Sequence, residues 1–172
     1  MRRLVTLAFT SALLVATATS ATASATPPRL MVDSYVVAAQ ARHLALSIED
    51  NSTEDGAHAV LEPLERLREQ QWALGENDIT PLENLGTGKC LRFASTASTP
   101  GNPVVQSRCT YGDRQTWYYV AADEHFETWR FQNVATDTCI AALDLAPGAR
   151  LVEEPCDEDD VEQRWTSIEV EE

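Results

Sequence analysis

Basic residues are scarce in this 172-residue sequence. Thirteen lysines and arginines stand against 27 aspartates and glutamates, which gives a formal net charge of −14. Nucleic acids and anionic membranes are bound mainly through basic side chains. The charge therefore argues against nucleic acid or a membrane as a partner, and its simplest explanation is solubility.

The sequence also lacks the usual motifs of catalytic and metal sites. It has three histidines and four cysteines, with no Cys-x-x-Cys or His-x-x-x-His spacing of zinc ligands. It has no Gly-x-Ser-x-Gly motif and no visible pair of nucleophile and base. Its many carboxylates form no active site by themselves, because catalytic pairs need a cleft that shifts their pKa values. We expect no enzymatic activity, no metal and no cofactor.

A long apolar run occurs near the start of the chain. Residues 1–3 include two arginines, residues 4–15 are apolar, and residues 23–25 form a small-x-small cleavage site. This is the layout of a secretory signal peptide, and the run is too short to be a good membrane span. We therefore expect residues 1–25 to be removed, residues 26–34 to form an exposed start, and the mature protein to be secreted, from a bacterium by the composition of its leader.

A short motif occurs three times. Gln-x-Trp ends at three tryptophans, Trp72, Trp117 and Trp165. Each copy closes a segment that begins at a glycine, and these glycines are Gly56, Gly101 and Gly148. The first two segments are equally long, and the third needs one inserted residue. A period of roughly 45 residues indicates a repeat architecture. We predict three homologous units, at about residues 35–78, 79–126 and 127–172.

The cysteines follow the same repeat. Eight residues after the three glycines stand Leu64, Cys109 and Cys156. Upstream, His43, Cys90 and Cys139 are placed as equivalents. Four cysteines allow three pairings, and the repeat selects the one that stays inside the units. We expect disulfides between Cys90 and Cys109 and between Cys139 and Cys156, with His43 and Leu64 replacing the pair in the first unit.

Short runs that are apolar, or that alternate between apolar and polar residues, lie between turn residues and predict many short β-strands. Their threefold repetition predicts a closed β structure. One stretch, residues 57–74, has the local propensity of a helix. However, Pro63 would lie in its interior, and the stretch aligns without a gap with residues 102–117. The repeat therefore takes precedence, and we expect a single helical or 3₁₀ turn just before each Gln-x-Trp.

Three units that close on Gln-x-Trp, one of them with Lys89-Cys90-Leu91 and an internal cysteine pair, resemble the ricin B-type β-trefoil lectin-domain family. The resemblance covers roughly residues 35–165. It implies an all-β fold, the β-trefoil. It also implies that the three tryptophans pack in a common core and that the glutamines before them, among them Gln70 and Gln163, support it by hydrogen bonds.

Family members that bind galactose or xylan use one shallow pocket per unit. An aspartate two residues after the first cysteine and an asparagine just before Gln-x-Trp bind sugar hydroxyls, and an aromatic ring two residues before the second cysteine stacks on the sugar. The aspartate position here holds Ala45, Arg92 and Ala141. The aromatic position holds Glu62, Ser107 and Glu154. The asparagine position holds Glu69, Arg114 and Glu162. The usual hexose pockets are therefore expected to be absent or altered.

The middle unit offers a candidate ligand pocket of another kind. The resemblance brings Arg92 and Arg114 to one shallow site beside Gln115. Guanidinium groups suit carboxylate or sulfate ligands, such as an acidic sugar or a carboxylate of a partner. The alternative is that both arginines pair with local acids such as Asp113.

An acidic run at residues 157–160 carries oxygens that calcium prefers, but it lacks the spacing of an EF-hand and is expected to be a solvated loop. Altogether the sequence predicts a secreted, non-catalytic binding module, monomeric unless it joins a complex. Its partner is a glycan by family resemblance. The alternative is a protein-interaction function, as an inhibitor or a toxin-associated subunit on the same scaffold.

Overall fold

The computed structural model describes residues 31–75, 79–125 and 127–170, so the expected signal peptide lies outside the described residues. Within them the chain forms thirteen β-strands and four 3₁₀ turns, and no helix is long and apolar enough to cross a membrane. The strands are β1 (Met31–Ala38), β2 (Ala41–Ile48), β3 (Ala59–Pro63), β4 (Gln71–Gly75), β5 (Ile79–Pro81), β6 (Glu83–Asn84), β7 (Lys89–Phe93), β8 (Val104–Arg108), β9 (Thr116–Ala121), β10 (Trp129–Asn133), β11 (Cys139–Ala142), β12 (Leu151–Glu154) and β13 (Trp165–Glu169).

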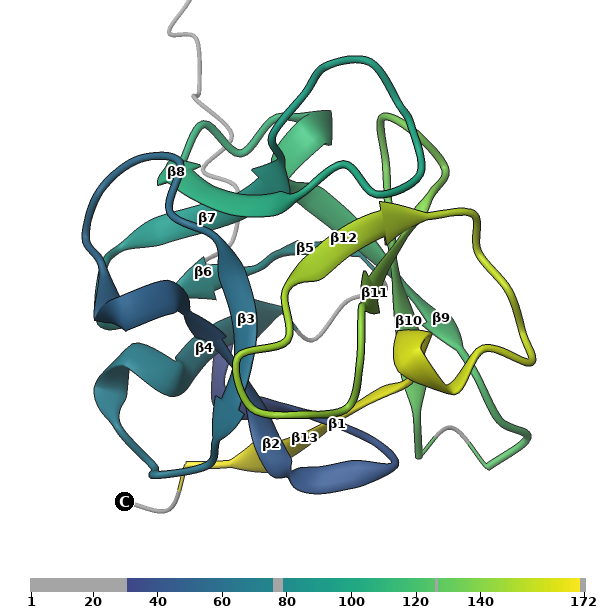
Figure 1. Cartoon of the computed structure of the whole chain (residues 1–172), viewed down its shortest axis with the longest axis horizontal. Coiled ribbons are helices and arrows are strands. Elements are labelled where there is room, and N and C mark those ends of the chain that lie inside the picture. The colour runs from purple at the N-terminus through teal and green to yellow at the C-terminus, as the bar shows by residue number, and fades with distance from the viewer. Residues whose placement is uncertain (1–30, 76–78, 126, 171–172) are drawn as a thin grey trace, which may run out of the picture.

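Six positions around a ring form a closed barrel (Figure 1). Strand β1 pairs with β4 and β13, β13 with β10, β10 with β9, and β9 with β5. Beyond Leu82 the chain continues from β5 into β6, which pairs with β4 and closes the ring. Strand β1 begins at Met31, so part of the expected exposed start belongs to the barrel. The predicted all-β, β-trefoil fold is confirmed.

Three hairpins, β2–β3, β7–β8 and β11–β12, cover one end of the barrel and pair with one another in a cycle. The amide of Gly56 donates to the carbonyl of Gln106 at 2.8 Å, that of Gly101 to Glu153 at 2.8 Å, and that of Gly148 to Leu61 at 2.7 Å. All three glycines have φ between 79° and 90°, a region that L side chains rarely adopt. The repeated glycine is therefore a requirement of hairpin contact.

The residue whose carbonyl accepts the hydrogen bond from each glycine differs among the three units. Leu61, Gln106 and Glu153 are all buried at equivalent positions in β3, β8 and β12. The Glu153 carboxylate accepts hydrogen bonds from Asn102 at 2.7 Å, from Thr138 at 2.7 Å, and from Ser98. Its charge is thus matched by donors from neighbouring segments, as a buried carboxylate requires.

A 3₁₀ turn precedes each Gln-x-Trp, as predicted. These turns are η2 (Arg68–Gln70), η3 (Asp113–Gln115) and η4 (Val161–Gln163), and a fourth, η1 (Glu49–Asn51), follows β2. A buried glutamine ends each of η2, η3 and η4, and its side chain hydrogen-bonds the loop that precedes the turn. Gln70 Nε2 donates to Pro63 O at 2.8 Å, and Gln163 Nε2 donates to Pro155 O at 2.9 Å. Gln115 Nε2 donates in the same way to Arg108 O at 2.9 Å. The glutamine side chains therefore fix the loops that connect the hairpins to the barrel strands.

The three tryptophans lie in the common core, with exposed fractions of 0%, 0% and 1% for Trp72, Trp117 and Trp165. Trp72 Nε1 donates to Leu46 O at 3.0 Å, and Trp165 Nε1 donates to Ile140 O at 3.3 Å. Trp117 Nε1 has no hydrogen-bond partner among the described residues. The Trp117 ring packs against Phe93 in a T-shaped arrangement, with ring centroids 5.2 Å apart.

Both expected disulfides are present, between Cys90 and Cys109 and between Cys139 and Cys156. The first unit needs a correction, however.

Ala45, and not His43, is the equivalent of Cys90 and Cys139. Ala45 lies opposite Glu62, as Cys90 lies opposite Ser107 and Cys139 lies opposite Glu154. The alignment was shifted by two residues at this place, because β1 and β2 pair with an irregular register that no cysteine marks in the sequence. Ala45 and Leu64 pack instead against Tyr35 and Val37, and the Tyr35 hydroxyl donates to Arg66 O at 3.0 Å. An apolar cluster thus replaces the disulfide.

Candidate functional site

The hairpins and the loops that follow them create one surface region per unit, and the three regions differ in chemistry. In the middle unit, Arg92 leaves β7 and is half buried, while Arg114 is an exposed residue of η3. Arg92 Nε donates to Ser107 Oγ at 3.1 Å, and its Nη1 donates to Phe93 O and Ala94 O, both at 2.8 Å. Arg92 therefore lies folded along its own hairpin.

Arg114 attaches to the same hairpin loop, since its Nη1 donates to Thr96 O at 3.3 Å. Gln115 Nε2 reaches the Ser107 hydroxyl at 2.9 Å, which links Gln115 to Arg92 through one oxygen. The structure thus brings together Arg92, Arg114 and Gln115 around the β7–β8 hairpin. Neither arginine pairs with Asp113 or with another carboxylate among the described residues.

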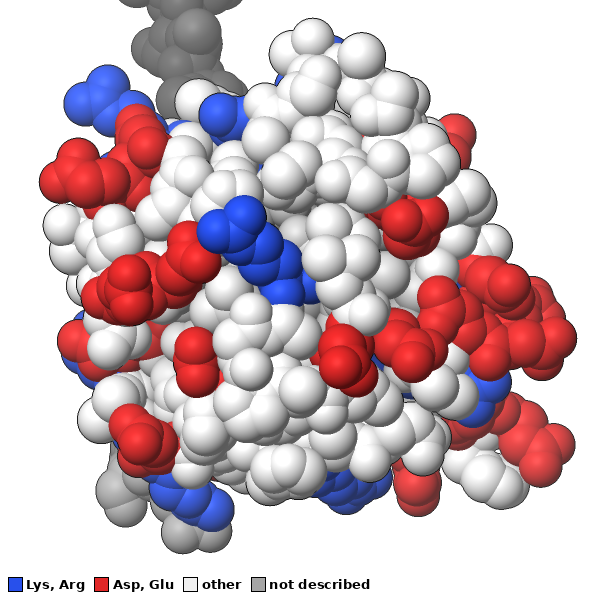
Figure 2. Space-filling view, viewed as in Figure 1, with Lys and Arg blue, Asp and Glu red and all other residues white. Residues whose placement is uncertain are grey.

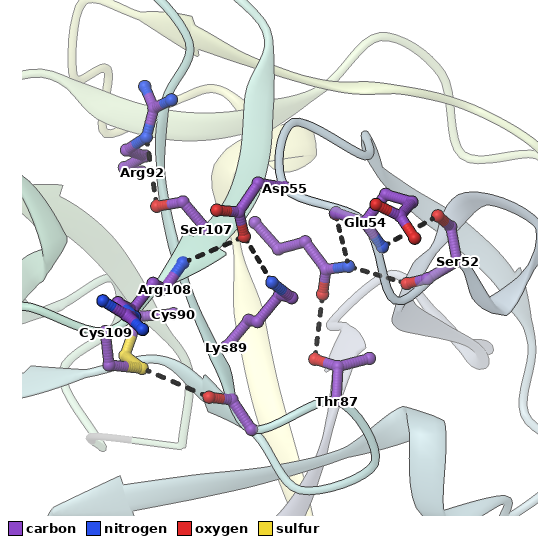
Figure 3. A network of polar contacts seen from close by, with 12 residues as sticks. Ser52, Glu54, Asp55, Thr87, Lys89, Cys90, Arg92, Ser107, Arg108 and Cys109 are labelled. Carbon is purple, nitrogen blue, oxygen red and sulfur yellow. Dashed lines mark hydrogen bonds and ion pairs between the residues drawn. A yellow bond between two sulfur atoms is a disulfide. The ribbon is translucent and has the colours of Figure 1, made fainter.

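A second polar group joins the middle hairpin to the first one (Figure 3). Asp55 accepts hydrogen bonds from the Lys89 ammonium and, at 3.1 Å, from the Arg108 amide. The hydrogen bond from Lys89 is the main cause that lowers the pKa of Asp55 below its usual value. Next to this pair, the buried Gln106 amide donates to Ser52 O at 2.6 Å and to Glu54 O at 3.0 Å. This group of polar contacts joins the first and the middle unit.

One exposed ring was missed by the sequence reasoning. Tyr111 is 60% exposed in the loop between β8 and η3, and its φ is 56°. Its hydroxyl donates to Glu83 Oε2 at 3.0 Å, and this bond raises the pKa of Tyr111. The ring lies four residues after the position where the family places its aromatic, so only its occurrence in the same loop could have signalled it.

The first unit has a hollow of about 180 Å³ between η1 and the loop that leads to η2. It is lined by polar side chains and a short apolar edge, namely Ser47, Ile48, Asp50, Asn51, Glu62, Pro63, Glu65, Leu67 and Gln70. Because Ala45 is the equivalent of the first cysteine, Ser47 and not Ala45 stands at the aspartate position here. Ser47 was therefore missed for the same reason that His43 was misplaced.

The third unit has a wider and strongly acidic hollow of about 480 Å³. Its lining residues are Glu154, Pro155, Cys156, Asp157, Glu158, Asp160 and Gln163. Figure 2 shows acidic side chains gathered over the loop between β12 and η4. A hydrogen bond between the carboxyl groups of Glu162 and Asp160, with the negative charges of Asp160 and Asp144, raises the pKa of Glu162. Like charges so close disfavour the ionised form.

A titration checks this acidic region. The carboxyl carbon of Glu162, followed by NMR, is expected to titrate above pH 4.5, and Asp160→Asn is expected to lower that midpoint. The pKa of Glu162 is raised in the folded protein, so its protonated carboxyl stabilises the fold. This stabilisation is complete below the pKa of the unfolded state and is lost as the pH rises through the pKa of the folded state. Asp157→Asn is the matched control, and an unchanged midpoint in Asp160→Asn would contradict the assignment.

One group of potential metal ligands exists among the described residues, formed by Glu83, Cys90 and Cys109. Both cysteines are joined in a disulfide, so their sulfurs are not thiolate ligands.

Known protein families and solved structures agree with this fold. Residues 68–152 match the family of the ricin-type beta-trefoil lectin domain-like proteins. This chain carries a ricin-type β-trefoil domain. The matched residues run from η2 to β12, so they include the complete middle unit of the trefoil. No curated protein sequence matches the chain significantly.

Solved structures with the same trefoil are numerous. A designed threefold symmetric protein, ThreeFoil, aligns with a TM-score of 0.72 and 21% identity over 80% of this chain and 99% of its own. The ricin B-like lectin of Macrolepiota procera, in complex with lactose, aligns with a TM-score of 0.62 and 15% identity over 78% of this chain and 93% of its own.

A lectin of Polyporus squamosus, bound to the epitope Neu5Aca2-6Galb1-4GlcNAc, aligns with a TM-score of 0.66 and 20% identity over 80% of this chain. The trefoil spans 48% of that lectin. At these identities the likeness establishes the fold, and the ligand has to be argued from the surface regions of this chain.

Proposed function

We propose that this trefoil is a secreted, non-catalytic carbohydrate-binding module and that the hollow of the first unit holds a neutral sugar. The hollow is the observation that carries the proposal, because it combines hydroxyl, amide and carboxylate groups in one concave place. The family match and the lactose complex of the Macrolepiota procera lectin support a saccharide as the ligand. The two disulfides are compatible with an oxidising, extracellular location.

The lining fits a polyol. The carboxylates of Asp50, Glu62 and Glu65 are acceptors for sugar hydroxyls, and the Asn51 amide offers both donors and acceptors. Three carboxylates in one hollow disfavour an acidic sugar because like charges repel. Leu67 is 40% exposed at the rim and provides apolar surface for the C–H face of a ring.

The hollow is held in shape before any ligand arrives. Gln70 lies at its base and accepts a hydrogen bond from the Glu65 amide at 2.9 Å while donating to Pro63 O. Asp50 and Asn51 have φ values of 56° and 50°, so the turn that carries them has a defined left-handed geometry. A site that is fixed in advance loses less entropy when it binds.

A glycan array followed by calorimetry tests this function. The wild-type protein is expected to bind neutral saccharides, and Asp50→Asn is expected to weaken binding by about tenfold, since a hydrogen bond to a charged group contributes about 1.5–3 kcal/mol. Asparagine is chosen because it tolerates the left-handed backbone at this position.

Asp113→Asn, at an exposed site of the middle unit, makes the same change in charge and serves as the control. Equal affinity of the wild type and Asp50→Asn for every bound neutral sugar would remove the first-unit hollow as the site. A silent array would instead favour a protein partner.

A further inference from the structure

Two arginines of the middle unit are held by the same hairpin without an ion pair to any described residue. Lys89 pairs with Asp55, and Arg150 pairs with Glu49 at 3.0 Å. Arg92 and Arg114 form no ion pair with any residue that the structure describes. Other described arginines, Arg108 of the same unit among them, also lack an ion pair, and what distinguishes Arg92 and Arg114 is that both donate to carbonyls of one loop. Their surroundings decide whether they are available to a ligand.

Arg92 is held so that one part of its guanidinium remains available. Three hydrogen bonds, from Nε to Ser107 and from Nη1 to the carbonyls of Phe93 and Ala94, fix the plane of the group. Its Nη2 makes no hydrogen bond within the described part of the chain, and Figure 3 shows the guanidinium directed away from the Lys89–Asp55 pair. The group is therefore oriented before binding, which reduces the entropy that a ligand must offset.

Arg114 donates to a carbonyl of the same loop. Its single bond, from Nη1 to Thr96 O, leaves Nε and Nη2 without a partner among the described residues. These two nitrogens form the edge that receives both oxygens of a carboxylate. The carbonyls of Ala94 and Thr96, which hold the two arginines, are two residues apart, so both groups belong to one small surface.

We propose that this surface is a second, anion-selective site, which binds the carboxylate of an acidic saccharide such as a uronic acid. The proposal rests on the carbohydrate-binding function but uses a different unit from the neutral-sugar hollow. Arg114 receives the carboxylate with two parallel hydrogen bonds, and Arg92 Nη2 adds a third donor or a favourable charge. The exposed Tyr111 ring, in the loop that leads to Arg114, offers a face for the rest of the saccharide.

The ligand carries an isolated acidic group. The whole protein is strongly negative, and long polyanions are repelled by such a field. A single carboxylate close to the two arginines feels mainly the local positive charge, because charges farther away than about 8 Å are screened at physiological ionic strength. A uronic acid at the end of a neutral chain meets both conditions.

The test compares two oligosaccharides that differ only in a terminal glucuronate or glucose. Calorimetry at low salt is expected to show at least about tenfold tighter binding of the acidic one, since hydrogen bonds to charged groups are the strong ones. Arg114→Gln is expected to abolish this preference without harm to the fold, because it removes only one long hydrogen bond. Arg92→Lys retains the charge but loses the fixed plane, and is expected to reduce the preference partly.

Arg108→Gln is the matched control, because it removes the same charge from an exposed neighbouring residue. The preference is expected to persist in this control and to weaken in about 0.5 M salt. The site is refuted if the acidic oligosaccharide binds no better than the neutral one, or if Arg114→Gln binds it as the wild type does. Neutral binding that depends on Asp50, without acidic preference, would refute this site alone. Absence of binding to both would refute the carbohydrate function as well.

Discussion

Trp72→Ala is expected to lower the free energy of unfolding by about 3–5 kcal/mol, the usual cost of deleting a buried large aromatic side chain. Trp72 is fully buried, and its ring nitrogen also satisfies the carbonyl of Leu46. The substitution therefore creates a cavity and leaves a buried acceptor without its donor. Urea unfolding monitored by circular dichroism measures the change.

Phenylalanine variants separate the two contributions. Trp72→Phe removes the hydrogen bond as well as some volume, whereas Trp117→Phe removes volume only, because Trp117 Nε1 has no partner among the described residues. Trp72→Phe is thus expected to be the more destabilising of the two by about 1–3 kcal/mol, the cost of an unsatisfied buried group. Equal losses would show that the Leu46 contact contributes little.

A third disulfide is expected to form in the double variant Ala45→Cys, Leu64→Cys. These positions are 19 residues apart, as are Cys90 and Cys109, and they occupy the same places in the hairpin and loop of their unit. The oxidised variant is expected to be about 3 kcal/mol more stable than the double variant Ala45→Ser, Leu64→Ser, which retains both native disulfides, because closure of a loop of this size restricts the unfolded chain.

The serine variant loses the same Leu64 packing against Tyr35, so the comparison cancels that loss. A thiol assay on the unfolded, unreduced cysteine variant is expected to find no free thiol, and thermal unfolding of the two variants without reductant measures the gain. The single variant Leu64→Cys is the control, with one free thiol. Two free thiols in the double variant would show that Ala45 and Leu64 are not equivalent to the half-cystines.

Much of the fold was predictable because the same residue types make the same contacts in each of the three units. The glycine at each hairpin has a positive φ, and the glutamine before each tryptophan clamps a loop, so each residue type is required three times over. That recurrence outweighed the helical propensity of residues 57–74, which form β3, η2 and β4. Local propensity is decided by neighbouring residues, whereas a strand is stabilised by partners that are distant in the sequence.

Less of the candidate sites was predictable. The arginines of the middle unit were identified from their positions in the repeat, but their hydrogen bonds to the carbonyls of their own hairpin were not. Ser47 was missed because the first unit has no cysteine to mark its register, and the register of strands follows from pairing. Tyr111 was missed because its loop places the ring away from the family's aromatic position.

The sequence by itself determined the number of units, the disulfide pairing, the buried tryptophans and the place of each 3₁₀ turn. These features depend on residues that repeat at a constant spacing, which a single chain displays directly. Only the tertiary structure decided which side chains surround a hollow and which are used within the fold. Burial and hydrogen bonding depend on segments that meet across units, such as η1 with the loop before η2, and their spacing in the chain carries no trace of that contact.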